Sequence, residues 1–265
     1  MPGVPAIGIG RSNTITWGCT TSRVDSADVW QEKLNEDETK YMLDGEWTDL
    51  KVVEETIKVK GQADKVYKVK MTHRGPIMPY KLMQLNSGLL FGGEAPDMEH
   101  NHWYSFAWSG QWAGDDSFHV LQNIYNSKDL HELYAKFDGE MGESYQGLGQ
   151  NVLFADTSGN IGYRLLMTIP ERKDKTPFIG SRVLDGTTTK WDWTGKIIHQ
   201  KDLPRSLNPK KGYAVSANGR QTSDNATNDY GASSNSPGRT LRIDEILKTA
   251  TESGKKLSLA DLGAI

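Results

Sequence analysis

The stretch from Asn151 to Tyr163 places the strongest constraint on the fold. It reads N-V-L-F-A-D-T-S-G-N-I-G-Y, which is an apolar run, a turn and a second apolar run. Asp156 and Gly159 suit the turn, because aspartate hydrogen-bonds to its own backbone and glycine adopts conformations that other residues avoid. Two short runs joined in this way pair antiparallel. The stretch therefore predicts a β-hairpin, and with it a chain that contains antiparallel sheet.

The composition agrees with a strand-rich protein. The 265 residues include 27 glycines, 8 tryptophans and 10 tyrosines, which favours sheet over a helical bundle. The net charge of −3 gives no reason to expect a nucleic-acid partner. No apolar run approaches the ~20 residues that span a bilayer, the first residues lack the form of a secretory signal, and a single cysteine excludes an internal disulfide. These features do not indicate a compartment.

A strand, a polar loop and two carboxylates follow one another near the N-terminus. Residues 14–17 are β-branched or aromatic and predict a strand, which we expect Gly18 to end. Residues 20–22 predict a small polar loop. Asp25 and Asp28 then lie three residues apart, an arrangement that suits a hard, oxygen-ligated cation. The plainer alternative is an ordinary strand followed by a solvated acidic loop.

These two stretches resemble the penicillin acylase (penicillin amidase) family of N-terminal-nucleophile hydrolases. The N-terminal stretch, N-T-I-T-W-G-C-T-T-S-R-V-D-S-A-D, is similar to the family's W-G-x-T motif and acidic loop. The hairpin string is similar to N-x-x-x-A-D-x-x-G-N-I-G-Y, and I-P-x-R follows it at residues 169–172. Further landmarks, W-D-W-T-G, L-P, N-P and G-R-T-L-R-I-D-E-I-L, keep the family's order. With gaps, the resemblance covers nearly the whole chain.

The resemblance implies an α+β fold. We expect a fragment of the αββα N-terminal-nucleophile hydrolase architecture, mostly antiparallel sheet with a helical insertion at about residues 115–140. We treat residues 1–265 as a single partial domain, truncated at both ends. The first strand has no preceding element to pair with, and the capping-box pattern at Ser258–Asp261 stands too near the last residue for a full helix.

The resemblance also assigns residues to an active site. By position, the backbone N–H of Thr21 and the carboxamide of Asn218 are the two donors to the oxyanion, and Arg239 is a supporting arginine. An amide N–H suits the role, because it donates without being titrated. A turn asparagine is the alternative interpretation of Asn218.

A structural calcium ion is implied at the acidic loop. By position its ligands are Asp25, the Ala27 carbonyl and Asp28. Ser234 stands near the place where the family often has a further aspartate, so we expect this site to be weakened or lost. No other cofactor is expected.

The family's nucleophile has no counterpart in the chain. It is an N-terminal serine, cysteine or threonine, and we expect Cys19 instead to be a buried, inert thiol. The resemblance implies a hydrolase acting on carbon–nitrogen bonds of linear amides through an acyl-enzyme, here a fragment inactive alone. Its expected partners are a small-molecule amide substrate and a missing N-terminal segment that carries the nucleophile. The alternative is a degenerate, non-catalytic member that binds acyl ligands.

The remaining segments have plainer interpretations. We predict antiparallel strands over residues 29–34, 47–60 and 66–71, with one face packed and one wet. A short strand is predicted over 211–218. We expect Ser127 to cap the second of two helices. The repeat at helical spacing in the first of these helices is Phe118, Leu121, Ile124 and Tyr125.

Two histidine features invite a catalytic interpretation. His73 could be a base, but a structural hydrogen-bond partner is favoured. The acidic and histidine side chains within 81–103 could bind a metal, as in a nuclease, but their spacing favours a solvated loop. They are Asp97, Glu99, His100 and His102.

Overall fold

The structure is a computed structural model, and it describes most of the chain. The described residues are 7–22, 24–78, 102–112, 114, 116–143, 145, 147, 149–176, 180, 182–219, 230, 238–254, 256–258, 260 and 261. The strands are β1 (Gly10–Arg11), β2 (Ile15–Thr21), β3 (Ala27–Glu32), β4 (Lys40–Leu43), β5 (Glu46–Asp49), β6 (Lys51–Ile57), β7 (Lys65–Met71), β8 (Ile77–Met78), β9 (Trp103–Trp108), β10 (Gln150–Asp156), β11 (Ile161–Leu166), β12 (Pro170–Arg172), β13 (Val183–Asp185), β14 (Trp193–Ile197) and β15 (Arg205–Leu207). The helices are η1 (Ser109–Gln111), α3 (Ser117–Asn126), α4 (Leu130–Asp138), α5 (Glu140–Glu143), η3 (Thr189–Trp191), η4 (Gln200–Asp202) and α6 (Gly238–Glu252).

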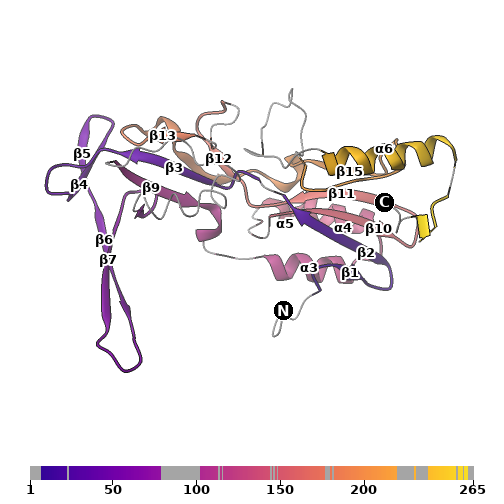
Figure 1. The fold of residues 1–265 in the computed structure, drawn as a ribbon, viewed down its shortest axis with the longest axis horizontal. Helices are drawn as coiled ribbons and strands as arrows, with labels where there is room; N and C mark the ends of the chain where they lie inside the picture. The colour runs from indigo at the N-terminus through magenta and orange to yellow at the C-terminus, as the bar shows by residue number, and fades with distance from the viewer. Residues whose placement is uncertain are drawn as a thin grey trace.

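Two sheets make up most of the described fold. A five-stranded antiparallel sheet has the order β1-β2-β10-β11-β15, and a four-stranded sheet has the order β13-β3-β9-β8. Within the second sheet, the β13–β3 pair is parallel and the other pairs are antiparallel. The two sheets lie one after the other along the long axis of the molecule, and β4–β5 and β6–β7 project at one end (Figure 1). The fold class is α+β with mostly antiparallel sheet, as predicted.

The predicted hairpin is the centre of the five-stranded sheet. β10 and β11 pair from Gln150–Leu166 to Ala155–Ile161. The Asp156 carboxylate accepts hydrogen bonds from the backbone of Ser158 and Asn160, both at 2.9 Å, so it forms the turn as expected. Its other oxygen accepts from the backbone N–H of Leu130 at 2.9 Å. One turn residue therefore also anchors the start of α4.

The strand β2 is longer than predicted. It runs through Gly18, which pairs with Leu153 of β10, and continues to Thr21, which pairs with Gln150. Gly18 does not end the strand, because the partner strand continues the ladder past it. The expected polar loop at residues 20–22 is therefore largely the end of a central strand.

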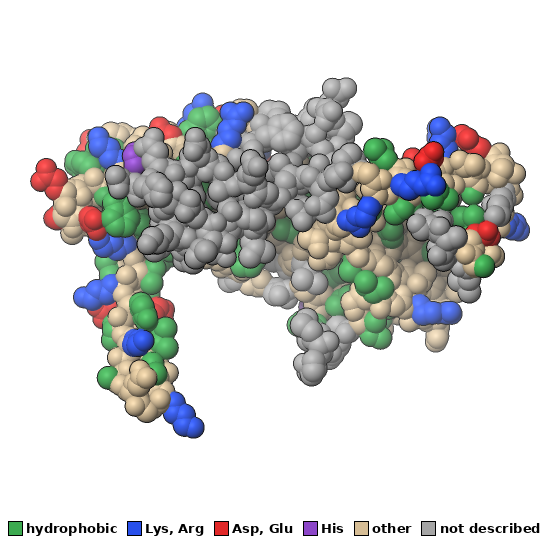
Figure 2. All heavy atoms as spheres, in the orientation of Figure 1, with side chains coloured by type: hydrophobic (Ala, Val, Ile, Leu, Met, Phe, Trp, Pro, Cys, Tyr) green, Lys and Arg blue, Asp and Glu red, His purple; other side chains and the backbone are tan. Residues whose placement is uncertain are grey.

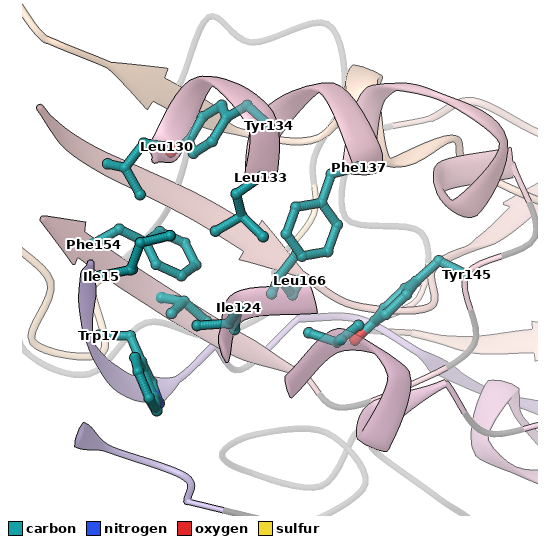
Figure 3. Packing of buried hydrophobic residues seen from close by; sticks show 12 residues of the cluster. Ile15, Trp17, Ile124, Leu130, Leu133, Tyr134, Phe137, Tyr145, Phe154 and Leu166 are labelled. Carbon is teal, nitrogen blue, oxygen red and sulfur yellow. The ribbon is translucent and has the colours of Figure 1, made fainter. Parts of the chain in front are cut away.

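A core of apolar side chains fills the space between the five-stranded sheet and the helices α3 and α4. Alternate residues of β2 and β10 point to this face, as strand geometry requires, and the helices supply the opposite wall (Figure 3). The buried residues of this cluster include Ile15, Trp17, Ile124, Leu130, Leu133, Tyr134, Phe137, Tyr145, Phe154 and Leu166. The same alternation sends Thr20 and Asn151 to the other face of the sheet.

The helices α3 and α4 lie within residues 115–140, where a helical insertion was expected, and α5 extends beyond this range. Two details differ from the prediction. Asp129, and not Ser127, caps α4, because its carboxylate accepts from the backbone N–H of Glu132 at 2.8 Å. Ser127 instead ends α3, donating its hydroxyl to Asn123 O at 2.6 Å. Val120 and Ile124 form the buried face of α3, and Phe118 lies outside this face and is exposed.

The strands over residues 29–71 also differ from the prediction. β3 pairs with β9 and β13 instead of with the next strand in the chain. The expected strand 47–60 divides at Leu50 into β5 and β6, which form separate hairpins with β4 and β7. Most residues of β6 and β7 are exposed on both faces, so the prediction of one packed face is wrong for this hairpin.

Two C-terminal segments complete the fold. Residues 211–218 carry Asn218 but form no strand, contrary to the prediction. Ser258 and Asp261 make the reciprocal hydrogen bonds of a capping box. None of the helices in the described ranges has the length and apolar character that crossing a bilayer requires.

The buried ring of Phe137 provides a test of the core. We expect Phe137→Ala to lower the free energy of unfolding by about 3–5 kcal/mol, because the removed ring leaves a cavity. Urea unfolding followed by tryptophan fluorescence measures this value. Phe118→Ala is the matched control, because that ring is 47% exposed, and we expect a change within about 0.5 kcal/mol. Equal losses in the two variants would contradict this description of the core.

Candidate active site

The end of β2 presents a peptide group at an unpaired sheet edge. The N–H of Ser22 donates to Gly149 O on the β10 side at 3.5 Å. Successive peptide groups of a strand point to opposite edges, so the N–H and C=O of Thr21 point away from β10. β1 occupies that edge only alongside Thr16 and Trp17. In the part of the chain that the structure describes, the edge at Thr21 is therefore open to groups other than a strand.

Asn218 reaches this edge from a distant part of the sequence. Its Nδ2 donates to Thr21 O at 3.0 Å. The backbone of Asn218 is left-handed, with φ of 64°, a conformation in which asparagine is enriched because its short polar side chain tolerates it. An amide nitrogen carries two N–H groups, and the bond to Thr21 O uses one of them.

Arg239, at the start of α6, fixes the orientation of the Asn218 amide. Its Nη2 donates to Asn218 Oδ1 at 2.8 Å and to Ala217 O at 3.2 Å. A guanidinium can only donate, so the atom that it contacts must be the amide oxygen. Nδ2 is thereby turned toward Thr21. The structure brings together the three residues that the sequence analysis placed in the active site, Thr21, Asn218 and Arg239.

A second set of hydrogen bonds joins the end of β2 to residues 216–218, and it was not predicted from the sequence. Thr20 Oγ1 and Ser216 Oγ are 2.7 Å apart. Asn151 Nδ2 donates to Thr20 Oγ1 at 3.3 Å and to Thr21 O at 3.4 Å. Tyr163 donates its hydroxyl to Asn151 Oδ1 at 2.8 Å. The sequence does show a polar residue, Asn151, at the start of an apolar strand, which could have indicated a buried hydrogen bond. It does not show the partner of Asn151, because that partner depends on the register of β2 against β10.

A pocket of about 220 Å³ lies beside these ties. Its lining includes Asn151, Tyr163, Ser216, Gly219 and Thr240. Burial raises the pKa of the Tyr163 hydroxyl well above its usual value, so this side chain remains a neutral donor at physiological pH. The pocket wall therefore carries neutral hydroxyl and amide groups, together with the charged side chain of Lys211.

Cys19 lies two residues before Thr21 on the same strand. It is partly buried and packs against the core beneath α3 and α4. Burial raises the pKa of its thiol, which disfavours the reactive thiolate. This environment agrees with the expectation of an inert thiol.

The predicted calcium ligands surround an arginine. Asp28 is fully buried, and its two carboxylate oxygens accept from Arg172 at 2.7 and 3.2 Å. Arg172 Nη2 also lies 3.0 Å from a carboxylate oxygen of Asp25, and Trp193 Nε1 donates to Asp28. Burial alone would lower the pKa of the Arg172 guanidinium, but Asp28 and Asp25 outweigh it and raise that pKa.

This set of side chains does not fit calcium on its own. Calcium takes six to eight oxygen ligands, and the carboxylates of Asp25 and Asp28 are already balanced by the Arg172 guanidinium. Ala27, the third expected ligand, is buried in β3. Across the described ranges, no group of three or more His, Cys, Asp or Glu side chains is placed to hold a metal ion. The calcium ion stays a prediction.

His73 belongs to a structural network away from Thr21. Its Nδ1 contacts the Tyr41 hydroxyl at 3.0 Å, and its Nε2 contacts Asp192 at 3.1 Å. Arg74 donates to Asp192 at 2.6 Å and to Glu32 at 3.0 Å. These bonds join β3, the β4–β5 hairpin and the start of β14. The geometry supports the structural interpretation of His73.

The histidine-rich insertion is only partly described. His102 contacts the side chain of Gln31 through Nδ1. Asp97, Glu99, His100 and Ser234 lie outside the described residues. The nuclease interpretation gains nothing from His102.

Comparison with known sequences agrees with the resemblance described above. The chain matches the family model for penicillin amidase over residues 1–265. Penicillin G acylase of Escherichia coli is 26% identical over 232 residues, which covers 85% of this chain and 24% of that protein. Acyl-homoserine lactone acylase QuiP of Pseudomonas syringae pv. syringae (strain B728a) is 22% identical over 225 residues, which covers 83% of this chain and 24% of that protein.

A solved structure shares the fold. The thermostable penicillin G acylase from Alcaligenes faecalis, in its orthorhombic form, has a TM-score of 0.68 at 23% identity, covering 95% of this chain and 40% of that chain. The chain spans about a quarter of the length of the two relatives above.

The ion pair between Arg172 and Asp28 provides a test of the electrostatics. We expect Arg172→Met to lower the free energy of unfolding by about 3–5 kcal/mol, because it leaves a buried carboxylate without its partner. Urea unfolding with and without calcium measures this loss. Lys175→Met, which removes an exposed pair with Glu171, is the control, and we expect a loss under about 1 kcal/mol. A loss for Arg172→Met that calcium fully restores would show that the ion, not the arginine, balances the site.

The carboxyl of Asp192 predicts a pH dependence. Burial alone would raise its pKa, but the hydrogen bonds from His73 and Arg74 outweigh it and hold the pKa below its usual value. Because the folded-state pKa is lowered, the ionised carboxylate of Asp192 stabilises the folded protein at pH values above the unfolded-state pKa, which is about 3.9. This stabilisation is lost as the pH falls through the folded-state pKa. We therefore expect Asp192→Asn to lower the free energy of unfolding at pH 7, and the difference from the wild type to narrow below about pH 4.

Urea titrations between pH 7 and pH 3 measure this narrowing. Asp49→Asn is the control, because Asp49 forms an exposed pair with Lys40 and such pairs contribute little. A difference between Asp192→Asn and the wild type that stays constant over this range would contradict the assignment.

Proposed function

This chain belongs to the penicillin amidase family, and from that premise we propose that it is part of an amidohydrolase that cleaves the carbon–nitrogen bond of linear amides. The acylases that it matches support hydrolysis of an amide as the general reaction. The acyl-enzyme route, the residue roles and the substrate range given below are parts of the proposal.

The convergence of Thr21 and Asn218 carries the proposal. The Thr21 N–H points to an open sheet edge, and the Asn218 amide lies at the same edge, 3.0 Å from Thr21 O. Both groups are neutral donors, so they stabilise a developing negative charge without exchanging protons with it. Arg239 acts through Asn218 by fixing its amide orientation, and is a positioning residue.

The proposed reaction proceeds in two steps. A nucleophilic hydroxyl or thiol attacks the amide carbonyl, and the carbonyl oxygen becomes an oxyanion that accepts from Thr21 N–H and Asn218 Nδ2. The carbon–nitrogen bond breaks, the proton from the nucleophile passes to the departing amine, and an acyl-enzyme forms. Water then attacks the acyl-enzyme, releasing the carboxylic acid and regenerating the nucleophile.

The nucleophile and its base are proposed to come from polypeptide outside residues 1–265. The chain corresponds to about a quarter of the length of its relatives, so most of a complete enzyme lies beyond it. A structural calcium ion is proposed only with further ligands from outside the described residues, because Asp25 and Asp28 are paired with Arg172, and no step of the reaction passes through it.

The genomic reading frame tests this proposal. We expect the frame to continue upstream of the Met1 codon and to encode a Gly-Ser, Gly-Cys or Gly-Thr junction that releases the nucleophile. The product of that frame should hydrolyse phenylacetyl or long-chain acyl amides, whereas residues 1–265 alone should not. Turnover by the isolated chain, or a complete product that binds acyl ligands without turnover, would contradict the proposal. The second of these results would identify a degenerate, non-catalytic member.

Asn218 provides the sharpest variant. In the complete enzyme we expect Asn218→Ala to lower kcat by about 10²–10³-fold, the effect of removing one oxyanion donor. Steady-state hydrolysis of the preferred amide measures it. Asn126→Ala, at an exposed position on α3, is the matched control and should leave kcat unchanged. An Asn218→Ala enzyme that raises KM with kcat intact would assign the residue to substrate binding instead.

A further inference from the structure

The β6–β7 hairpin projects from the body of the molecule with no covering layer among the described residues. It extends away from the sheets at the β4–β5 end (Figure 1), and its strands pair along their full length, from Lys51–Met71 to Ile57–Lys65. An isolated two-stranded hairpin is marginally stable in water, and independent stability takes a third strand or a packed face. A long hairpin of this kind therefore calls for a partner.

The two faces of the hairpin differ in chemistry. Residues directly opposite in an antiparallel pair lie on the same face, so the Val53–Val69 pair marks one face. Alternation adds three further apolar residues to it. We call this face the apolar face: its apolar members are Val53, Ile57, Tyr67, Val69 and Met71, and it also carries Lys51, Glu55 and Lys65.

The opposite face carries charge. It holds the ion pair between Lys68 and Glu54 at 3.2 Å and the pair between Lys70 and Glu38 at 2.8 Å, with Val52 and Val66 as its apolar members. Figure 2 shows apolar side chains at the surface of the projecting hairpin. On the apolar face, Ile57 and Tyr67 remain 53% and 49% exposed. On the opposite face, Val52 and Val66 are 52% and 58% exposed, but they are its only apolar members among the paired residues, whereas the apolar face has five. A partner on the apolar face therefore contacts more apolar side chains, whose burial is favourable.

A pocket at the base of the hairpin continues the apolar face. It has a volume of about 390 Å³, large enough for bulky side chains. The Trp112 and Trp193 rings meet edge to face, with centroids 5.4 Å apart, and Trp108 is 47% exposed. Its lining includes the charged side chains of Glu55 and Arg74. It also includes six large apolar side chains from the hairpin and the tryptophan-rich segments: Val53, Val69, Met71, Trp108, Trp112 and Trp193.

The length of the relatives identifies the occupant. The chain covers 24% of Escherichia coli penicillin G acylase, and it covers 40% of a solved acylase chain that shares its fold. Most of the polypeptide of a complete acylase thus lies outside the matched part. Contiguous exposed apolar and aromatic side chains mark surfaces for polypeptide partners.

We propose that the apolar face and the tryptophan pocket form a docking surface for a polypeptide segment of the complete acylase that lies outside residues 1–265. An apolar or aromatic side chain of that segment fills the pocket, and its neighbours cover Ile57 and Tyr67. The inference rests on the proposed function only for the identity of the occupant. Because the hairpin projects at the β4–β5 end, away from the sheet that contains β2 (Figure 1), docking is a matter of assembly and not of catalysis.

Amide hydrogen exchange tests the proposal on two proteins: residues 1–265 alone and the full product of the genomic reading frame that contains them. We expect the β6 and β7 amides to exchange rapidly in the isolated chain. In the full product they should be protected by at least about tenfold more, because a covered hairpin opens less often. Equal exchange in the two proteins, or a frame that adds no polypeptide to residues 1–265, would overturn the proposal.

Matched variants identify the face. In the full product, Val69→Asp on the apolar face should remove the added protection, whereas Val66→Asp on the charged face should keep it. Because Val69→Asp could unfold the hairpin itself, Trp108→Ala removes a pocket wall from outside the hairpin. Trp103→Ala, at the other end of β9, is its control. Equal effects within each pair would contradict a docking surface on this face.

Sedimentation and hydrolysis measurements distinguish the proposed occupant from a second copy of the chain, and docking from catalysis. Sedimentation equilibrium of the isolated chain should show a monomer. Self-association that Val69→Asp abolishes would assign the face to a second copy and overturn the proposed occupant. Hydrolysis is measured separately: activity with an unprotected hairpin would overturn the docking surface alone, and a protected hairpin without activity would overturn the proposed function alone.

Discussion

The antiparallel pairing of β2 with β10 is the constraint on which the rest of the structure depends. One register, from Thr21–Gln150 to Ile15–Asp156, sets both faces of the central sheet and its edge. It directs Trp17 and Phe154 into the core beneath the helices, and it places Thr20 beside Asn151 on the opposite face. It also turns the Thr21 peptide outward. A slip by one residue would exchange the two faces and remove the candidate site together with the core.

The candidate site is held mainly by neutral hydrogen bonds, whereas the buried ion pairs of Arg172 and Arg74 lie elsewhere. The side-chain amides of Asn218 and Asn151 both donate to the Thr21 carbonyl. Arg239 is charged, but its contact is with the oxygen of the Asn218 amide. The buried pair of Arg172 with Asp28 instead joins β12 to β3. This division suits oxyanion chemistry, because fixed neutral dipoles stabilise a developing charge without titrating.

The sequence predicted the local elements better than their partners. The turn at Asp156 and the presence of the helices α3 and α4 follow from short-range patterns, and both were predicted correctly. The extension of β2 through Gly18 could not be predicted, because it depends on a partner strand more than 130 residues away. The convergence of Thr21 and Asn218 was expected only from a resemblance. Their tie through Asn151, like the Arg172–Asp28 pair, depends on strand register, which a single sequence does not specify.

The most direct test of this account is a nuclear Overhauser measurement between the Thr21 amide proton and the side-chain amide protons of Asn218. It uses residues 1–265 alone, selectively labelled, so that it depends on neither a nucleophile nor a substrate. The account predicts a cross-peak between these protons that Arg239→Met weakens, since the guanidinium orients the amide. Asn218 amide protons that exchange as in a free side chain, with no cross-peak to Thr21, would contradict it.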